Sequence, residues 1–143
     1  MVVERYWRQE CFGLAIQAPV YEKPQSKEEN KPLLLPEKCA SNRVITEYLF
    51  GRGIDFEIIN YCISNDLIFE SLPYHNVVFV GYDEKKEPKY AAYRSTNKRR
   101  IMGDCSGSKK DYSFRLGKEN LEEVHLFECA IDLLSYATLA KLN

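Results

Sequence analysis

The sequence predicts an α+β fold in which a helical hairpin precedes a small antiparallel sheet and one more helix closes the chain. Apolar residues recur at helical spacing through residues 41–65, which indicates two amphipathic helices. The apolar run 77–80 is followed by a polar turn and a second strand-like segment, as in a β-hairpin. An alanine- and leucine-rich segment after Glu128 has helical character.

Size and composition limit the classes of function. A chain of 143 residues with 45% hydrophobic residues can build one compact domain, or one and a half. The net charge is −1, so any electrostatic attraction to nucleic acid must be local. No apolar run approaches the roughly 20 residues of a membrane span and no signal peptide opens the chain, so we expect a cytoplasmic protein with no membrane partner.

The cysteines do not form a recognisable framework. They are five in number, widely spaced, and without a C-x-x-C pair, which is the pattern of neither a disulfide scaffold nor a zinc motif. We expect reduced thiols and no structural zinc site.

The composition divides the chain into four parts. Residues 1–18 have apolar residues at helical spacing and predict an N-terminal helix. Residues 19–38 contain four prolines and a charged run, which indicates an extended linker. We expect a folded subdomain over 39–120 and the start of a second unit over 121–143.

Within the subdomain, capping and turn residues set the helix ends. Ser41 or Asn42 is expected to cap the first helix, which stops at Gly51 or Gly53. Asp55 is expected to cap the second helix.

The strand pattern is strongest at residues 76–82, which are apolar on both faces and predict a central, covered strand. Residues 89–95 read as its antiparallel partner after the polar turn 83–88, and residues 67–69 as a short edge strand.

A basic stretch follows this hairpin. Residues 85–118 contain eleven basic and three acidic side chains, a local net charge of +8, which favours contact with phosphates. A solvated loop that only keeps the protein soluble is the alternative. Tyr90 and Tyr93 could stack on bases, although tyrosines on a strand more often belong to the core. The expected phosphate contacts are Arg94, Lys98, Arg99 and Arg100, with Lys89 and Lys109 behind them.

The segment before Glu128 reads as a short buried strand that ends at this carboxylate. A carboxylate at the C-terminal end of a strand could bind a divalent cation. It could equally be an acid that favours the dipole of the following helix.

Four segments in order resemble the catalytic core of bacterial-type DNA primases, and more closely the primase-related proteins of mobile elements in which a domain of unknown function precedes a Toprim domain. Residues 48–54 (YLFGRGI) resemble the helix end YLxxRGI/L, and residues 75–83 (HNVVFVGYD) the segment hNRVhFPIhD. Residues 89–96 (KYAAYRST) resemble the strand with the family's GR position, and residues 127–132 (FECAID) the first Toprim motif, VEGYMD.

The resemblance implies that residues 121–143 are the first β-α unit of a Toprim fold. It places Glu128 at the Toprim glutamate, a general acid/base or Mg²⁺ ligand in nucleotidyl transfer, and Asp132 one helical turn further on. A Toprim site also needs a later Asp-x-Asp pair, which this chain lacks, and Cys129 replaces the family's glycine. We therefore expect a fragment without a complete Mg²⁺ site, inactive by itself.

Two functions follow. The first is a DNA-binding module of a primase- or topoisomerase-like protein, which guides a single strand or a template-primer toward Glu128. The second is a non-enzymatic interaction or scaffold domain with a primase-like fold. An Asp-x-Asp pair further along the gene would favour the first. Because residues 130–140 are apolar nearly all round, we also expect self-association through this last helix.

Overall fold

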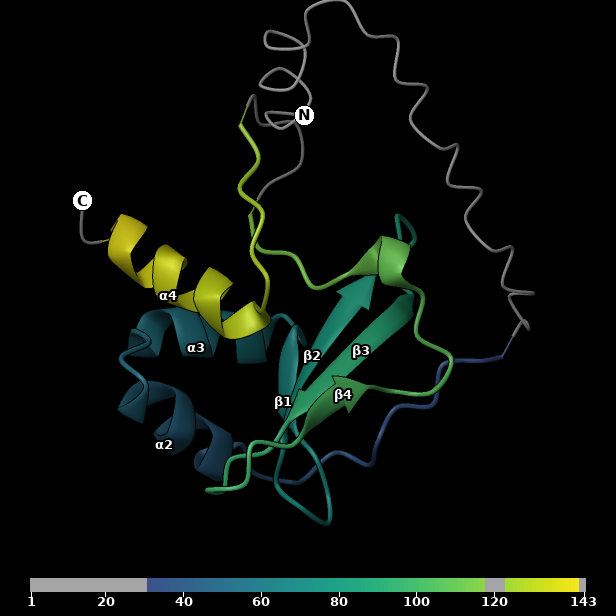
Figure 1. Ribbon diagram of the computed structural model, residues 1–143, viewed down its shortest axis with the longest axis horizontal. Coiled ribbons are helices and arrows are strands. Elements are labelled where there is room, and N and C mark those ends of the chain that lie inside the picture. The colour runs from purple at the N-terminus through teal and green to yellow at the C-terminus, as the bar shows by residue number, and fades with distance from the viewer. Residues whose placement is uncertain (1–30, 118–122, 142–143) are drawn as a thin grey trace, which may run out of the picture.

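The computed structural model describes residues 31–117 and 123–141, which form an α+β fold (Figure 1). Within this part of the chain, three α-helices accompany a four-stranded antiparallel sheet of order β1-β2-β3-β4. The helices are α2 (Arg43–Gly51), α3 (Phe56–Ser64) and α4 (Ala130–Lys141), with a short 3-10 helix η1 (Lys110–Tyr112). The strands are β1 (Ile68–Glu70), β2 (Val77–Tyr82), β3 (Pro88–Arg94) and β4 (Met102–Asp104).

The sheet confirms the predicted hairpin. β2 pairs with β3 in antiparallel register, and the short edge strand expected near residues 67–69 is β1. β4 was not predicted, because its three residues include a glycine and alternate with no clear period. Gly81 in β2 has a structural role, since a Cβ there would lie 1.6 Å from the carbonyl oxygen of Tyr112.

β2 is covered on both faces, as predicted. Val77 and Phe79 face a core built with α2, α3 and α4, in which Phe79 contacts the ring of Phe114 edge to face. Val78 and Val80 face a second, smaller core on the other side of the sheet, where Leu33 packs. The alternation of side chains along a strand distributes these four apolar residues between the two cores.

The helix caps are partly as expected. Asp55 caps α3 through a 2.7 Å hydrogen bond from the Glu57 amide to its Oδ1, and Gly53 ends the preceding turn with a φ of +84°. Asn42 precedes α2 but its side chain does not cap it. The Asn42 side chain accepts a hydrogen bond from the Glu70 amide instead, at 2.9 Å.

The strand predicted before Glu128 is wrong. Residues 123–127 have no regular secondary structure, and Val124 and Leu126 are exposed. An isolated apolar segment does not form a strand without a neighbouring ladder to accept its backbone hydrogen bonds, and no described strand pairs with it. The helix that follows is confirmed as α4, which packs against α3 through Ile131 and Leu134.

Residues 32–38 of the expected linker run beside the sheet. The Leu34 amide donates to the Ser106 carbonyl at 2.9 Å, and Lys38 forms an isolated antiparallel bridge with Ser71. The helix predicted over residues 1–18 and the linker up to residue 30 lie outside the described residues. None of the described helices has the length and apolar character that crossing a bilayer requires.

Candidate nucleic-acid interface

The loop between β3 and β4, residues 95–101, presents three consecutive cations. Its backbone is closed by hydrogen bonds from the Ser95 amide to the Ile101 carbonyl (2.8 Å) and from the Ile101 amide to the Arg99 carbonyl (2.9 Å). Lys98, Arg99 and Arg100 are exposed, and no acidic side chain of the described residues pairs with them. We call Lys98, Arg99 and Arg100 the basic loop; its positive charge is open to an external anion.

Arg94, at the end of β3, has a different environment. Its Nε donates a 3.1 Å hydrogen bond to the hydroxyl of Tyr48 on α2, and its side chain is partly buried. Arg94 therefore ties the sheet to α2 at the base of the basic loop.

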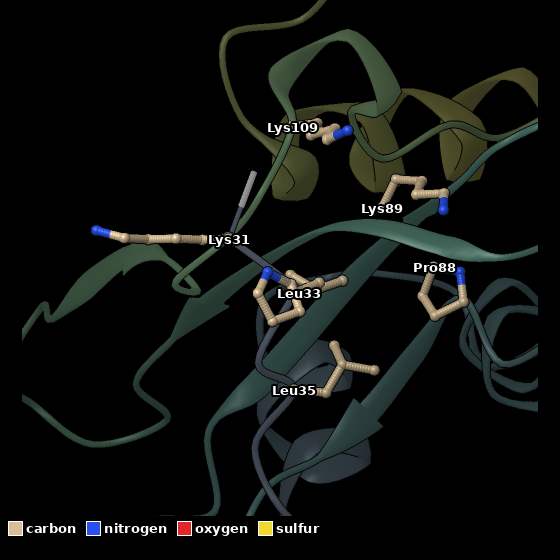
Figure 2. A pocket seen from close by; sticks show the side chains of 8 residues that line it. Lys31, Leu33, Leu35, Pro88, Lys89 and Lys109 are labelled. Carbon is tan, nitrogen blue, oxygen red and sulfur yellow. The ribbon is translucent and has the colours of Figure 1, made fainter. Parts of the chain in front are cut away.

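Lys89 and Lys109 lie elsewhere. They line an open pocket of about 370 Å³ together with residues 31–33, Leu35, Pro88 and Gly107 (Figure 2). Lys89 is already paired with Glu87 (2.9 Å) and Asp83 (3.6 Å), and the hydrogen bond that Lys89 donates to Glu87 raises the pKa of Lys89. Since five residues of β3 at about 3.3 Å each separate Lys89 from Arg94, the Cα atoms of these two residues are about 17 Å apart.

The aromatic residues near the basic loop differ from those expected. The hydroxyl of Tyr90 donates to Asp104 at 2.9 Å, and burial raises the pKa of Tyr90 to about 12. Tyr93 packs on the smaller core. Tyr74, which the sequence did not single out, is 76% exposed.

The loop that carries Tyr74, residues 71–76, neighbours the basic loop. The hydroxyl of Thr96 donates a 3.0 Å hydrogen bond to the carbonyl of His75. Ile101 and Met102, which follow the basic loop, are also exposed. One end of the sheet thus combines free cations with exposed aromatic and apolar groups.

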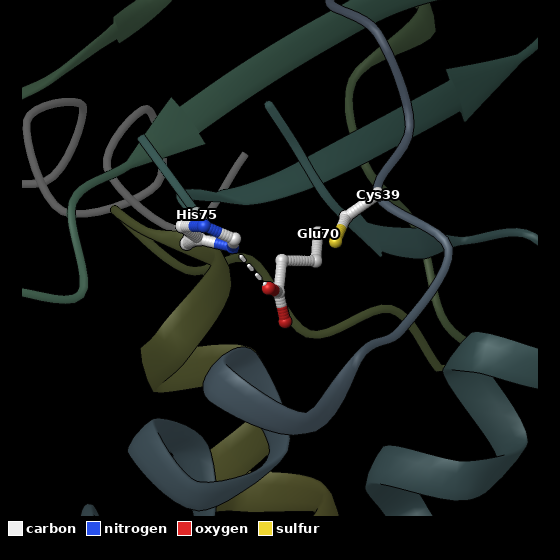
Figure 3. A group of neighbouring side chains, drawn as sticks. All are labelled: Cys39, Glu70 and His75. Carbon is white, nitrogen blue, oxygen red and sulfur yellow. Dashed lines mark hydrogen bonds and ion pairs between the residues drawn. The ribbon is translucent and has the colours of Figure 1, made fainter. Parts of the chain in front are cut away.

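A buried carboxylate lies at the same end. Glu70, at the end of β1, is 1% exposed. Its Oε2 accepts hydrogen bonds from the amides of Val44 (2.9 Å) and Ile45 (3.2 Å) in the first turn of α2. Its Oε1 lies 2.5 Å from Nδ1 of His75, and Cys39 lies beside it (Figure 3). The sequence signal for this cluster of Glu70, His75 and Cys39 is only a polar residue at the end of an apolar strand.

Glu128 stands apart from these features. It is exposed, and no described side chain forms a hydrogen bond or ion pair with it. Asp132 accepts a hydrogen bond from the Cys129 thiol at 3.1 Å. The start of α4 and the loop between β3 and β4 lie in different parts of the molecule (Figure 1), so the structure does not bring Glu128 and the basic loop together.

A family model described as protein of unknown function (DUF3991) matches residues 47–120, more than half of the chain. The chain belongs to the DUF3991 family. No curated protein and no solved structure matches it. Nothing in these comparisons shows a Toprim or primase relationship.

The DUF3991 match separates the candidate residues into two sets. The basic loop, Tyr74, Glu70 and His75 lie inside the matched residues, whereas Cys39 and Glu128 lie outside them. The end of the sheet that combines cations with an exposed aromatic ring is therefore part of the DUF3991 domain itself.

Proposed function

We propose that the DUF3991 domain of this chain is a nucleic-acid-binding module that holds the phosphates of a single DNA strand, or of a template-primer, at its basic loop. The observation that carries the proposal is the set of three adjacent, exposed cations that no described acidic side chain neutralises. Because the whole chain has a net charge of only −1, attraction to a phosphate backbone must come from a local cluster of cations such as this one.

The rigidity of the loop supports this assignment. Its hydrogen bonds, including the one from the Arg99 amide to Oδ1 of Asn97 (3.0 Å), fix the places from which the cations extend. Arg94 is the fourth contact, and its hydrogen bond to Tyr48 leaves its terminal guanidinium nitrogens for a phosphate. Lys89 and Lys109 form a second, weaker contact because Lys89 is already paired.

A single strand is favoured over a closed duplex because of Tyr74. An exposed aromatic ring stacks on any base whose face is open, and base stacking contributes about 1–3 kcal/mol per base. The hydrogen bond between Thr96 and His75 holds the loop of Tyr74 next to the basic loop, within reach of the same strand.

The test is the salt dependence of binding to a fluorescent oligothymidylate, followed by anisotropy. The triple variant Lys98→Glu/Arg99→Glu/Arg100→Glu should bind much more weakly. With about 0.7 per phosphate contact on a single strand, the slope of log K against log salt should fall by about 2 in magnitude.

The matched control is Lys85→Glu/Lys86→Glu/Lys110→Glu. It changes the net charge by the same amount but lies away from the basic loop, at the turn before β3 and at the start of η1. It should retain most of the affinity and the slope. Equal weakening by both triple variants, or binding that ignores salt, would contradict the proposal.

The sequence resemblance further suggests nucleotidyl transfer at Glu128, which we propose only for a site completed by other carboxylates. Within the described residues, Glu128 belongs to no group of three acidic, histidine or cysteine side chains close enough to hold an ion. One carboxylate does not retain Mg²⁺, which needs several oxygen ligands. Mn²⁺ titrations followed by electron paramagnetic resonance should therefore be the same for the chain and for Glu128→Gln. A decrease of the free Mn²⁺ signal with the unchanged chain, but not with Glu128→Gln, would contradict this.

A protein-interaction or scaffold domain is the second candidate. The observation that favours it is the exposure of the apolar side chains Val124 and Leu126 just before α4. Absence of any salt-dependent binding to single-stranded DNA would make it the better assignment.

A further inference from the structure

The structure brings together three side chains that the sequence separates. Cys39 precedes α2, Glu70 ends β1, and His75 lies in the loop between β1 and β2. Each offers one metal-ligating atom, and these atoms all lie within 4.8 Å of one another (Figure 3). We propose that Cys39, Glu70 and His75 form a binding site for Zn²⁺.

Backbone hydrogen bonds place the three residues. The Cys39 amide donates to the Glu70 carbonyl at 2.8 Å, and the Leu72 amide donates to the Glu37 carbonyl at 2.8 Å. Residues 37–39 therefore run antiparallel along residues 70–72, which sets Cys39 opposite Glu70. The His75 amide donates to the Ser71 carbonyl at 2.8 Å, and this tight loop returns the imidazole to Glu70.

The Glu70 carboxylate is oriented as a ligand. Its Oε2 is held by two amides of α2, which fixes the plane of the carboxylate and leaves Oε1 for a cation. Ligands of zinc sites are commonly held by such outer hydrogen bonds. Oε1 now lies 2.5 Å from Nδ1 of His75. A zinc ion would take the place of the proton between them.

The geometry requires only small movements. Zinc bonds of about 2.3 Å to sulfur and about 2.0–2.2 Å to nitrogen and oxygen, arranged tetrahedrally, separate the ligand atoms by about 3.3–3.6 Å. The oxygen and nitrogen must therefore move apart by about 1 Å, and the sulfur already lies within 4.8 Å of both. The side chain of His75 is 44% exposed and Cys39 is half-buried, so both can make these adjustments. The exposed side leaves the fourth position to water.

The chemical types of the three ligand atoms favour Zn²⁺. One thiolate, one imidazole and one carboxylate suit Zn²⁺, whereas Mg²⁺ and Ca²⁺ require an oxygen cage. Glu70 and His75 satisfy each other through their mutual hydrogen bond, but the thiol of Cys39 forms no hydrogen bond within the described residues. A bound metal ion would coordinate that sulfur.

The test uses Co²⁺ as a spectroscopic probe and Zn²⁺ as its competitor, on the whole chain after reduction and removal of metals. Co²⁺ should give a thiolate-to-cobalt charge-transfer band and intense visible bands of a tetrahedral ion, which saturate at one equivalent and disappear on addition of Zn²⁺. Cys39→Ser should abolish the charge-transfer band, and His75→Ala should weaken Co²⁺ binding at least tenfold.

The matched control is Cys105→Ser, which removes another half-buried thiol in a different part of the sheet. It should leave the cobalt spectrum unchanged. Glu70 is kept intact because its carboxylate also holds α2, and circular dichroism verifies that each variant is folded. No charge-transfer band at stoichiometric Co²⁺, or the same band in Cys39→Ser, would overturn the proposal.

Discussion

At the scale of single residues, Glu70 is the buried charge that joins three elements. Its carboxylate accepts from two amides of α2 and contacts His75. Removing one partner of a buried, charge-assisted network leaves the remaining donors without an acceptor. We expect Glu70→Ala to lower the free energy of unfolding by about 3 kcal/mol, measured by urea denaturation.

The control for this prediction is Glu47→Ala. Glu47 pairs with Arg43 at 2.8 Å, but both side chains are largely exposed. An exposed pair of this kind contributes little to stability, because water screens the charges and holding both side chains costs conformational entropy. Equal losses in the two variants would show that Glu70 adds nothing through its burial.

At the scale of elements, Asp55 joins the start of α3 to the end of α4. Its Oδ1 caps α3 through the Glu57 amide and accepts from Nζ of Lys141 at 3.2 Å. The Glu57 amide, followed by Lys141, lowers the pKa of Asp55 below its ordinary value. The carboxylate is therefore ionised in the folded chain at a pH where the unfolded chain has begun to bind a proton.

The sign of the pH dependence follows from this direction. The contribution of Asp55 to stability is present above the pKa of the unfolded chain, about 3.9, and is lost as the pH falls through the lower folded pKa. Asp55→Asn keeps a capping oxygen but does not titrate. We expect the urea midpoints of the two proteins to differ at pH 6 and to converge toward pH 3. A constant difference would contradict the assignment.

At the scale of the whole molecule, the sequence predicts the parts whose signal is local. The continuous apolar run predicts β2, and the cap at Asp55 predicts α3, because both depend on neighbours in the chain. The cap of α2 comes from Glu70, 26 positions after Val44, and the cluster at Cys39 depends on the same distant pairing. The strand expected before Glu128 has the right composition but no described partner strand.

The last prediction concerns α4 and the segment before it. Ile131 and Leu134 face the core, whereas Leu139 is 62% exposed and Leu126 is 91% exposed. Burying such apolar surface against a second copy removes it from water, which stabilises the association by about 25 cal/mol per Å². We expect self-association that increases with concentration, measured by light scattering after gel filtration.

The variant Leu126→Ser/Leu139→Ser should shift this equilibrium to the monomer because it removes apolar surface on the side that the core does not cover. Phe50→Ser is the matched control, since Phe50 is equally apolar and 61% exposed but lies on α2. A chain that stays monomeric at every concentration, or an association that the double variant leaves intact, would contradict the prediction. Association lost equally in Phe50→Ser would place the contact on the helical hairpin instead of on α4.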